Sequence, residues 1–255
     1  MTHRILILGG TTEARIMAGK LADRSDFDVT LSLAGRTRDP APQPVPVRFG
    51  GFGGAEGLAR YLAENGMKIL IDATHPFAAR MSSHAAVAAK QAGIPAIALR
   101  RSEWQPVHGD RWTMAASIDK GVVALGEKPR RVFVALGRQE LAPLLRVPQH
   151  FYLIRSVDPV EPPLDLPHAD YVLARGPFPE EAERDLLLSR RIDSILAKNS
   201  GGDAVYGKIA AARALGIEVI MVRRPPPPDM PAAGTVEEAL AMLDDHLASP
   251  AKRGV

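Results

Sequence analysis

Short apolar runs alternate with helical patterns along nearly the whole chain. The runs are rich in Ala, Val, Leu and Ile and lack polar alternation, as strands do when helices cover both faces of a parallel sheet. Strands are predicted over residues 5–8, 28–34, 68–72, 93–99, 131–136, 151–154, 170–174, 194–197 and 217–222. Helices are predicted after the first run and over residues 55–65, 81–92, 117–125, 139–145, 179–190 and 203–215, with a last helix capped by Thr235. This alternation predicts an α/β fold with parallel sheets.

The opening pattern of the chain returns in its second half. Residues 131–136 form an apolar run that ends in Gly137, just as residues 5–8 end in Gly9. We therefore expect two parallel-sheet domains with a cleft between them and a boundary near residues 125–130. The predicted domains are residues 1–127 and 128–248, and residues 249–255 are predicted to be a disordered tail.

The composition excludes several classes of protein. The chain has 32 basic and 29 acidic residues, a net charge of +3 and no basic block, so no nucleic-acid partner is expected. It has no cysteine, which excludes disulfides and thiolate chemistry. No apolar segment is long enough to span a membrane, and the first strand begins too early for a signal peptide. We expect a cytoplasmic protein without a membrane partner, with a monomer as the working expectation for its assembly.

The turn after the first strand is typical of nucleotide-binding units. Gly9, Gly10, Thr11 and Thr12 lie between an apolar strand and a helix. Glycines let the backbone approach a pyrophosphate, and the start of a helix offers free N–H groups. The third glycine of the usual fingerprint is missing, and Ala14 is the nearest small residue. A tight strand-to-helix connection without a ligand is the alternative.

The end of the second strand favours NADP over NAD. Gly35 and Arg36 stand where dinucleotide folds contact the adenosine ribose, and no acidic residue is present there. An acidic side chain at this place selects NAD, whereas an arginine accepts the 2′-phosphate of NADP. Arg38 is a second candidate, and a solvated surface arginine is the alternative interpretation.

Three polar residues lie at the end of the third predicted strand. Asp72, Thr74 and His75 come directly after an apolar run, at the edge of the sheet where ligands bind. A lone Asp or Thr here would be a helix cap. The three together favour a ligand-facing site. For the pair Arg100 and Arg101, a carboxylate clamp and a surface turn remain open alternatives.

Basic residues end three strands of the second half. Arg155, Arg175 and Lys198 each terminate an apolar run, and the carboxyl ends of parallel strands share one edge. Each alone could be a solvated charge, but three predict a surface for carboxylates or phosphates. The seven histidines show no metal-ligand spacing, so no metal is expected.

Five segments carry a resemblance to a known family. They are residues 7–15 (ILGGTTEAR), 72–78 (DATHPFA), 155–156 (RS), 175–178 (RGPF) and 198–201 (KNSG). With these segments in this order, the chain resembles the precorrin-6A reductase family of cobalamin biosynthesis over nearly its whole length. The DATHPFA and KNSG segments are the most specific.

The resemblance implies an NADPH-dependent oxidoreductase that reduces the double bond between ring carbons 18 and 19 of precorrin-6A or cobalt-precorrin-6A. It also implies two Rossmann-like domains, with strand exchange between them. The partner is then a small-molecule tetrapyrrole with many carboxylates. Whether this substrate contains cobalt is left open.

The expected roles combine this resemblance with the strand-end pattern. The pyrophosphate is expected at Gly9, Gly10, Thr11 and Thr12, the 2′-phosphate at Gly35 and Arg36, and the nicotinamide beside Asp72, Thr74 and His75. The substrate or the cofactor is expected at Arg155, Arg175, Lys198, Asn199 and Ser200. His75, Lys198 and Tyr206 are candidate proton donors, and solvent is another.

Two other functions remain open. A non-catalytic NADP-sensing protein could share the first half, but it would not need a cationic second half. A nucleotide-sugar transferase could share the two-domain arrangement, but acidic residues for a metal or a base would be more usual there.

Overall fold

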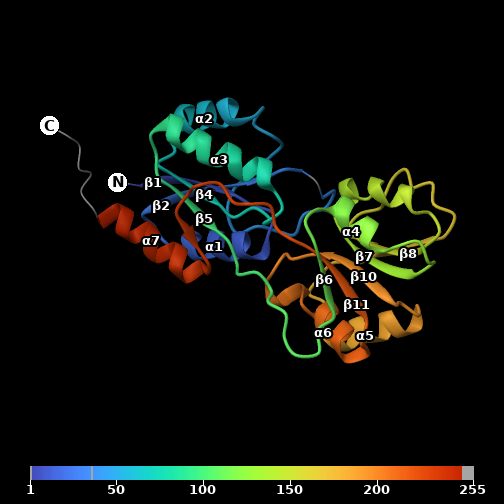
Figure 1. Ribbon diagram of the computed structural model, residues 1–255. Coiled ribbons are helices and arrows are strands. Elements are labelled where there is room, and N and C mark those ends of the chain that lie inside the picture. Colours follow the sequence, from blue (N-terminus) through green and yellow to red (C-terminus); the bar gives the residue numbers. More distant parts are fainter. Residues whose placement is uncertain (1, 36, 249–255) are drawn as a thin grey trace. The chain divides into compact units, whose positions relative to one another are not determined.

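The computed structural model describes residues 2–35 and 37–248, and it divides into two compact units (Figure 1). The first unit contains the chain up to Arg101 together with the chain from Pro225 onward, and the second contains Ser102–Arg224. This division corrects the expected boundary at residues 127 and 128. Residues 102–127 belong to the second unit and residues 225–248 to the first. The predicted tail, residues 249–255, lies outside the described residues.

The first unit is built on a six-stranded sheet in which neighbouring strands run parallel. Its order is β12-β5-β4-β1-β2-β3. The strands are β1 (His3–Leu8), β2 (Phe27–Leu33), β3 (Val47–Phe49), β4 (Ile69–Asp72), β5 (Ala96–Leu99) and β12 (Ala232–Ala233). The strand order reverses between β1 and β4, the arrangement of Rossmann folds, which bind ligands at that point.

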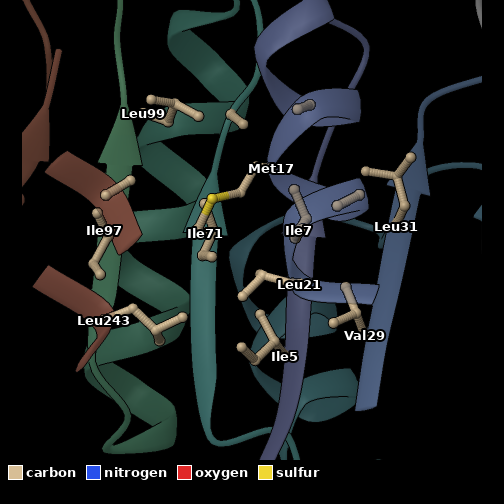
Figure 2. Close-up of a cluster of buried hydrophobic side chains, with 14 of the residues drawn as sticks. Ile5, Ile7, Met17, Leu21, Val29, Leu31, Ile71, Ile97, Leu99 and Leu243 are labelled. Carbon is tan, nitrogen blue, oxygen red and sulfur yellow. The ribbon is translucent and has the colours of Figure 1, made fainter. Parts of the chain in front are cut away.

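Helices cover both faces of this sheet. One face carries α1 (Thr12–Ala22) and α7 (Val236–Ala248), and the other carries α2 (Ala55–Glu64) and α3 (Ala79–Ala92) (Figure 1). Side chains alternate along β1, so Ile5 and Ile7 face α1 while Leu6 and Leu8 face α2 and α3. Figure 2 shows Met17 and Leu21 of α1 over these strands, together with other apolar side chains of the same core.

The second unit repeats the plan with the sheet order β6-β11-β10-β7-β8-β9. Its strands are β6 (Trp112–Ala115), β7 (Arg131–Ala135), β8 (Phe151–Ser156), β9 (Ala169–Leu173), β10 (Ser194–Lys198) and β11 (Glu218–Val222). One face packs against α5 (Glu180–Ser189) and α6 (Gly207–Leu215), and α4 (Ile118–Ala124) lies on the other. The helix expected over residues 139–145 is replaced by the 3-10 turns η1 (Arg138–Glu140) and η2 (Ala142–Arg146), because Pro143 interrupts helical hydrogen bonding. A third 3-10 turn, η3 (Asp203–Val205), precedes α6.

The last strand of each sheet comes from an unexpected part of the chain. The chain leaves β5 of the first sheet and enters β6 of the second, while β12, from near the C-terminus, completes the first sheet. Each of these strands leads into a helix with a hydroxyl cap, Ser117 for α4 and Thr235 for α7. The expected fold of two Rossmann-like units with strand exchange is therefore confirmed.

Candidate functional site

The turn after β1 is open, and its backbone requires glycine. The N–H of Gly9 donates to the carbonyl of Ser32 at 2.9 Å, and a Cβ at Gly9 would lie 2.6 Å from Cδ1 of Leu31. Gly10 has a φ of +113°, which L residues rarely adopt, and a Cβ there would meet nothing within 4 Å. Gly9 therefore packs tightly against Leu31, whereas Gly10 leaves an open space beside the backbone in front of α1.

Thr11 caps α1. Its Oγ1 accepts from the N–H of Ala14 at 3.1 Å and donates to the carbonyl of Ala73 at 2.9 Å. The single hydroxyl proton is therefore engaged within the protein. The groups that remain for an anion are the N–H groups of the first helical turn and the exposed Thr12.

Asp72 organises the loop that follows β4. This buried carboxylate accepts through Oδ1 from both the N–H and the hydroxyl of Thr74, at 3.2 and 2.7 Å. Nη2 of Arg100 lies 3.8 Å from its Oδ2, so the negative charge has a cation beside it. Register places Asp72 beside Leu8, next to the glycine turn. Asp72, Thr74 and the turn therefore lie at one edge of the first sheet.

His75 lies half-buried on the same loop. Its Nδ1 accepts from the N–H of Phe77 at 3.2 Å. This bond leaves the neutral ring's proton on Nε2.

Arg101 connects the end of β5 to α1. Its Nη1 lies 2.6 Å from Oε2 of Glu13 in the first turn of α1, and both side chains are largely buried. From the sequence, Arg100 and Arg101 could either clamp a carboxylate of a ligand or lie in a surface turn. The structure pairs both arginines with carboxylates of the same unit.

The end of β2 has an open backbone too. Gly35 is exposed and has a φ of +69°. Arg36, the expected partner of the 2′-phosphate, lies outside the described residues. On the neighbouring strand β3, Arg48 donates to the hydroxyl of Ser32 and to the carbonyls of Gly50 and Gly51.

Arg155 in the second unit is a buried core residue. It is 8% exposed, and its guanidinium donates two bonds to Glu183, at 2.5 and 2.9 Å. It also lies 3.7 Å from the ring centroid of Phe178. The expected contact between Arg155 and the substrate is unsupported, because the side chain points into the α5 face and its charge is already paired. A strand-end pattern cannot reveal this, since alternate residues of a strand face opposite sides.

Lys198 ends β10 beside a carboxylate that the sequence did not indicate. Its Nζ lies 2.5 Å from Oε2 of Glu140 in η1, and the same oxygen accepts from the N–H of Gly137. Lys198 follows Ala197, whose side chain belongs to the α5 and α6 face, so Lys198 faces the opposite side. Glu140 precedes Lys198 by 58 residues, so no local spacing could have linked them.

The side chain of Asn199 also forms its hydrogen bonds within the protein. It is 1% exposed, and its amide makes two bonds of 2.9 Å with the backbone of Trp104. Its own carbonyl accepts from Nε of Arg224. The expected substrate contact of Asn199 is therefore unsupported, because both polar groups of the amide hold the segment that enters the second unit.

The other expected residues of the second unit differ in exposure. Arg175 is exposed two residues beyond β9, and Ser200 is buried after β10. Tyr206 precedes α6, and its hydroxyl accepts from Arg213, which also pairs with Asp110. The structure thus groups Gly9, Gly10, Thr11, Thr12, Gly35, Asp72, Thr74 and His75 at one edge of the first sheet, and Arg175, Lys198 and Ser200 beyond the strand ends of the second.

The sequence model of the family described as "Precorrin-6x reductase CbiJ/CobK" matches residues 4–244. The chain belongs to this family. The precorrin-6A reductase of Sinorhizobium sp is 59% identical over 96% of this chain and 94% of its own. A solved structure described as "CobK precorrin-6A reductase" is 47% identical, covers both chains completely and has a TM-score of 0.93.

More distant members of the family carry a different substrate in their name. The cobalt-precorrin-6A reductase of Priestia megaterium is 31% identical over 87% of this chain and 90% of its own. The family match accounts for the paired Rossmann-like units and confirms the resemblance. In the part of the chain that the structure describes, no helix has the length and apolar character of a membrane span.

Proposed function

We propose that this protein reduces one carbon–carbon double bond of precorrin-6A, with NADPH as the hydride source, in cobalamin biosynthesis. The observation that carries the proposal is the family match over residues 4–244. The open glycine turn in front of α1 supports it independently, because a pyrophosphate needs close backbone approach and unpaired N–H groups.

The first unit would hold the cofactor, and its residues fit that group. The backbone of Gly9, Gly10 and Thr12 would bind the pyrophosphate, while Thr11 holds the turn through its cap. Gly35 and Arg36 would receive the 2′-phosphate. Asp72, Thr74 and His75 would border the nicotinamide, with Asp72 fixing the loop. When bound, NADPH supplies the hydride, so the protein's task is positioning and electrostatic stabilisation.

The second unit would bind the carboxylate arms of the tetrapyrrole. Lys198 and Arg175 are the proposed cations, with Ser200 as a hydrogen-bonding neighbour. Arg155 and Asn199 are assigned to the framework of this unit, because Glu183 and Trp104 occupy their polar groups. His75, Lys198 and Tyr206 are the proposed proton donors. The hydroxyl of Tyr206 accepts from Arg213 and keeps its own proton.

The metal-free macrocycle is the proposed substrate. Relatives named for precorrin-6A are 39–59% identical to this chain, whereas those named for the cobalt form are 26–31% identical. The higher identity to the relatives named for precorrin-6A therefore supports a substrate without cobalt.

The test is a titration followed by turnover. The purified protein is titrated with NADPH and with NADH under fluorescence detection, and then supplied with each tetrapyrrole. Tight binding of NADPH and faster oxidation of NADPH with metal-free precorrin-6A are expected. Failure to bind either nucleotide would overturn the cofactor assignment, and faster turnover of the cobalt form would overturn the substrate assignment.

A further inference from the structure

Phe49 is an exposed aromatic side chain at the carboxyl edge of the first sheet. It is the last residue of β3 and is 56% exposed. Side chains alternate along a strand, so Phe49 shares a face with Val47. Val47 packs against the core that contains Met17 and Leu21 of α1. Phe49 therefore stands on the α1 side of the sheet, beyond the last packed layer.

Its neighbours place Phe49 beside the end of β2. The register pairs Phe49 with Leu33, and the N–H of Gly50 donates to the carbonyl of Leu33 at 2.9 Å. Gly35 follows two residues later. In a dinucleotide fold the ribose of the adenosine half lies at the end of this second strand. The adenine attached to that ribose can then lie at the end of β3, the neighbour of β2 on the side away from β1.

The loop after Phe49 keeps this space open. A Cβ at Gly50, Gly51, Gly53 or Gly54 would meet nothing within 4 Å, and three of these glycines have positive φ. Arg48 orders the loop by donating to the carbonyls of Gly50 and Gly51, and its guanidinium lies 3.8 Å from the ring centroid of Phe52. These glycines place no side chain over Phe49, and the bonds from Arg48 hold the loop in position.

We propose that Phe49 is the stacking platform for the adenine ring of the bound dinucleotide. The inference rests on the proposed NADPH dependence and adds the residue that recognises the base. A purine presents a π-face to an aromatic side chain without any need for specific hydrogen bonds. An exposed phenyl ring beside the ribose site offers that face, whereas Phe52 and Tyr61 are packed against Arg48.

The test uses Phe49→Ala with three ligands: NADPH, NADH and 2′,5′-ADP, which lacks the nicotinamide half. Loss of an aromatic–base stack weakens binding by about 5- to 150-fold. We expect the Kd of all three ligands to rise by a common factor in Phe49→Ala and to stay near the wild-type value in Phe49→Trp. Phe49→Leu keeps an apolar side chain at this position and removes the π-face, so it should also weaken binding.

The matched control is Leu173→Ala. Leu173 is the last residue of β9, the corresponding edge strand of the second sheet, and is 57% exposed. This variant should leave all three Kd values unchanged. An unchanged Kd for 2′,5′-ADP in Phe49→Ala would overturn the inference while leaving NADPH dependence intact. A wild-type protein that binds none of the three ligands would overturn the proposed cofactor as well.

Discussion

Asn199 holds Trp104 by both backbone groups. Its Oδ1 accepts from the N–H of Trp104 and its Nδ2 donates to the carbonyl, each at 2.9 Å. Arg224 binds the carbonyl of Asn199 and the carbonyl of Ser102, so the residues where the chain enters and leaves the second unit meet at one loop. The KNSG segment is therefore a structural junction as well as a strand end.

Replacing Asn199 with leucine should lower stability strongly. Both backbone groups of Trp104 would lose their partners, and each unsatisfied group costs about 1–3 kcal/mol. Urea unfolding should therefore show a loss of several kcal/mol. Gln149→Met, which removes a peripheral amide bonded to Gly126, serves as the control with a small loss. If the Asn199→Leu protein were instead stable and had a raised KM for the tetrapyrrole, Asn199 would contact the substrate after all.

Arg155 and Glu183 should behave as a coupled pair. Arg155→Met leaves the buried carboxylate of Glu183 unpaired, and breaking one partner of a buried pair costs about 3–5 kcal/mol. The double variant Arg155→Met/Glu183→Leu removes that charge and should recover much of the loss in urea unfolding. Equal destabilisation of the single and double variants would contradict this coupling.

Lys198 and Glu140 should act on substrate affinity in opposite directions. Lys198→Met removes a proposed carboxylate partner, and a charge-assisted bond of about 1.5–3 kcal/mol corresponds to a rise in the substrate KM of roughly 10- to 150-fold. Glu140→Gln removes a competing carboxylate, so we expect a lower substrate KM. The Kd of NADPH should stay unchanged in both variants. The substrate KM is measured by steady-state kinetics and the Kd of NADPH by titration. A Lys198→Met variant with a changed Kd for NADPH and an unchanged substrate KM would contradict the assignment.

Arg36→Ala should discriminate between the two nicotinamide cofactors. If Arg36 binds the 2′-phosphate, its loss should raise the Kd of NADPH roughly 10- to 150-fold, since a charge-assisted bond is worth about 1.5–3 kcal/mol. NADH lacks that phosphate and should bind as before. Fluorescence titration of both cofactors gives the answer, and equal losses would remove Arg36 from this role.

His150 should make the protein less stable in acid. It is fully buried, and its Nδ1 accepts from the N–H of Arg130 at 3.1 Å. Burial lowers its pKa below the usual 6.5, so the native state favours the neutral ring. Below pH 6.5 the unfolded chain binds a proton that the native state resists, and stability falls with falling pH.

The variant His150→Asn tests this dependence. Asn can place an oxygen near the position of Nδ1 but does not titrate. The variant should be less stable at neutral pH, because a smaller side chain leaves a cavity, yet its melting temperature should fall less between neutral pH and pH 5.5 (about one unit below the ordinary histidine pKa). Parallel pH profiles of the two proteins would contradict the role of His150.

Apolar runs made the sheet interiors predictable from sequence, whereas the outermost strands were not. β3, β6 and β12 were missed because they have three, four and two residues and carry little apolar pattern. β6 places residues 102–127 in the second unit and β12 places residues 225–248 in the first, so missing these two strands misplaced the domain boundary. Arg155 and Asn199 were indistinguishable from ligand-facing residues, because the partners that bury them, Glu183 and Trp104, are distant in sequence.

The late position of β12 and α7 has a consequence for how the protein is made. The second unit is one continuous stretch, Ser102–Arg224, and its sheet can assemble as soon as the ribosome has released it. The first unit needs Ala239 and Leu243 from α7 to close its core. The glycine turn after β1 is therefore translated first but belongs to the unit that is finished last. A fragment ending at Arg101 would leave the core of that unit uncovered.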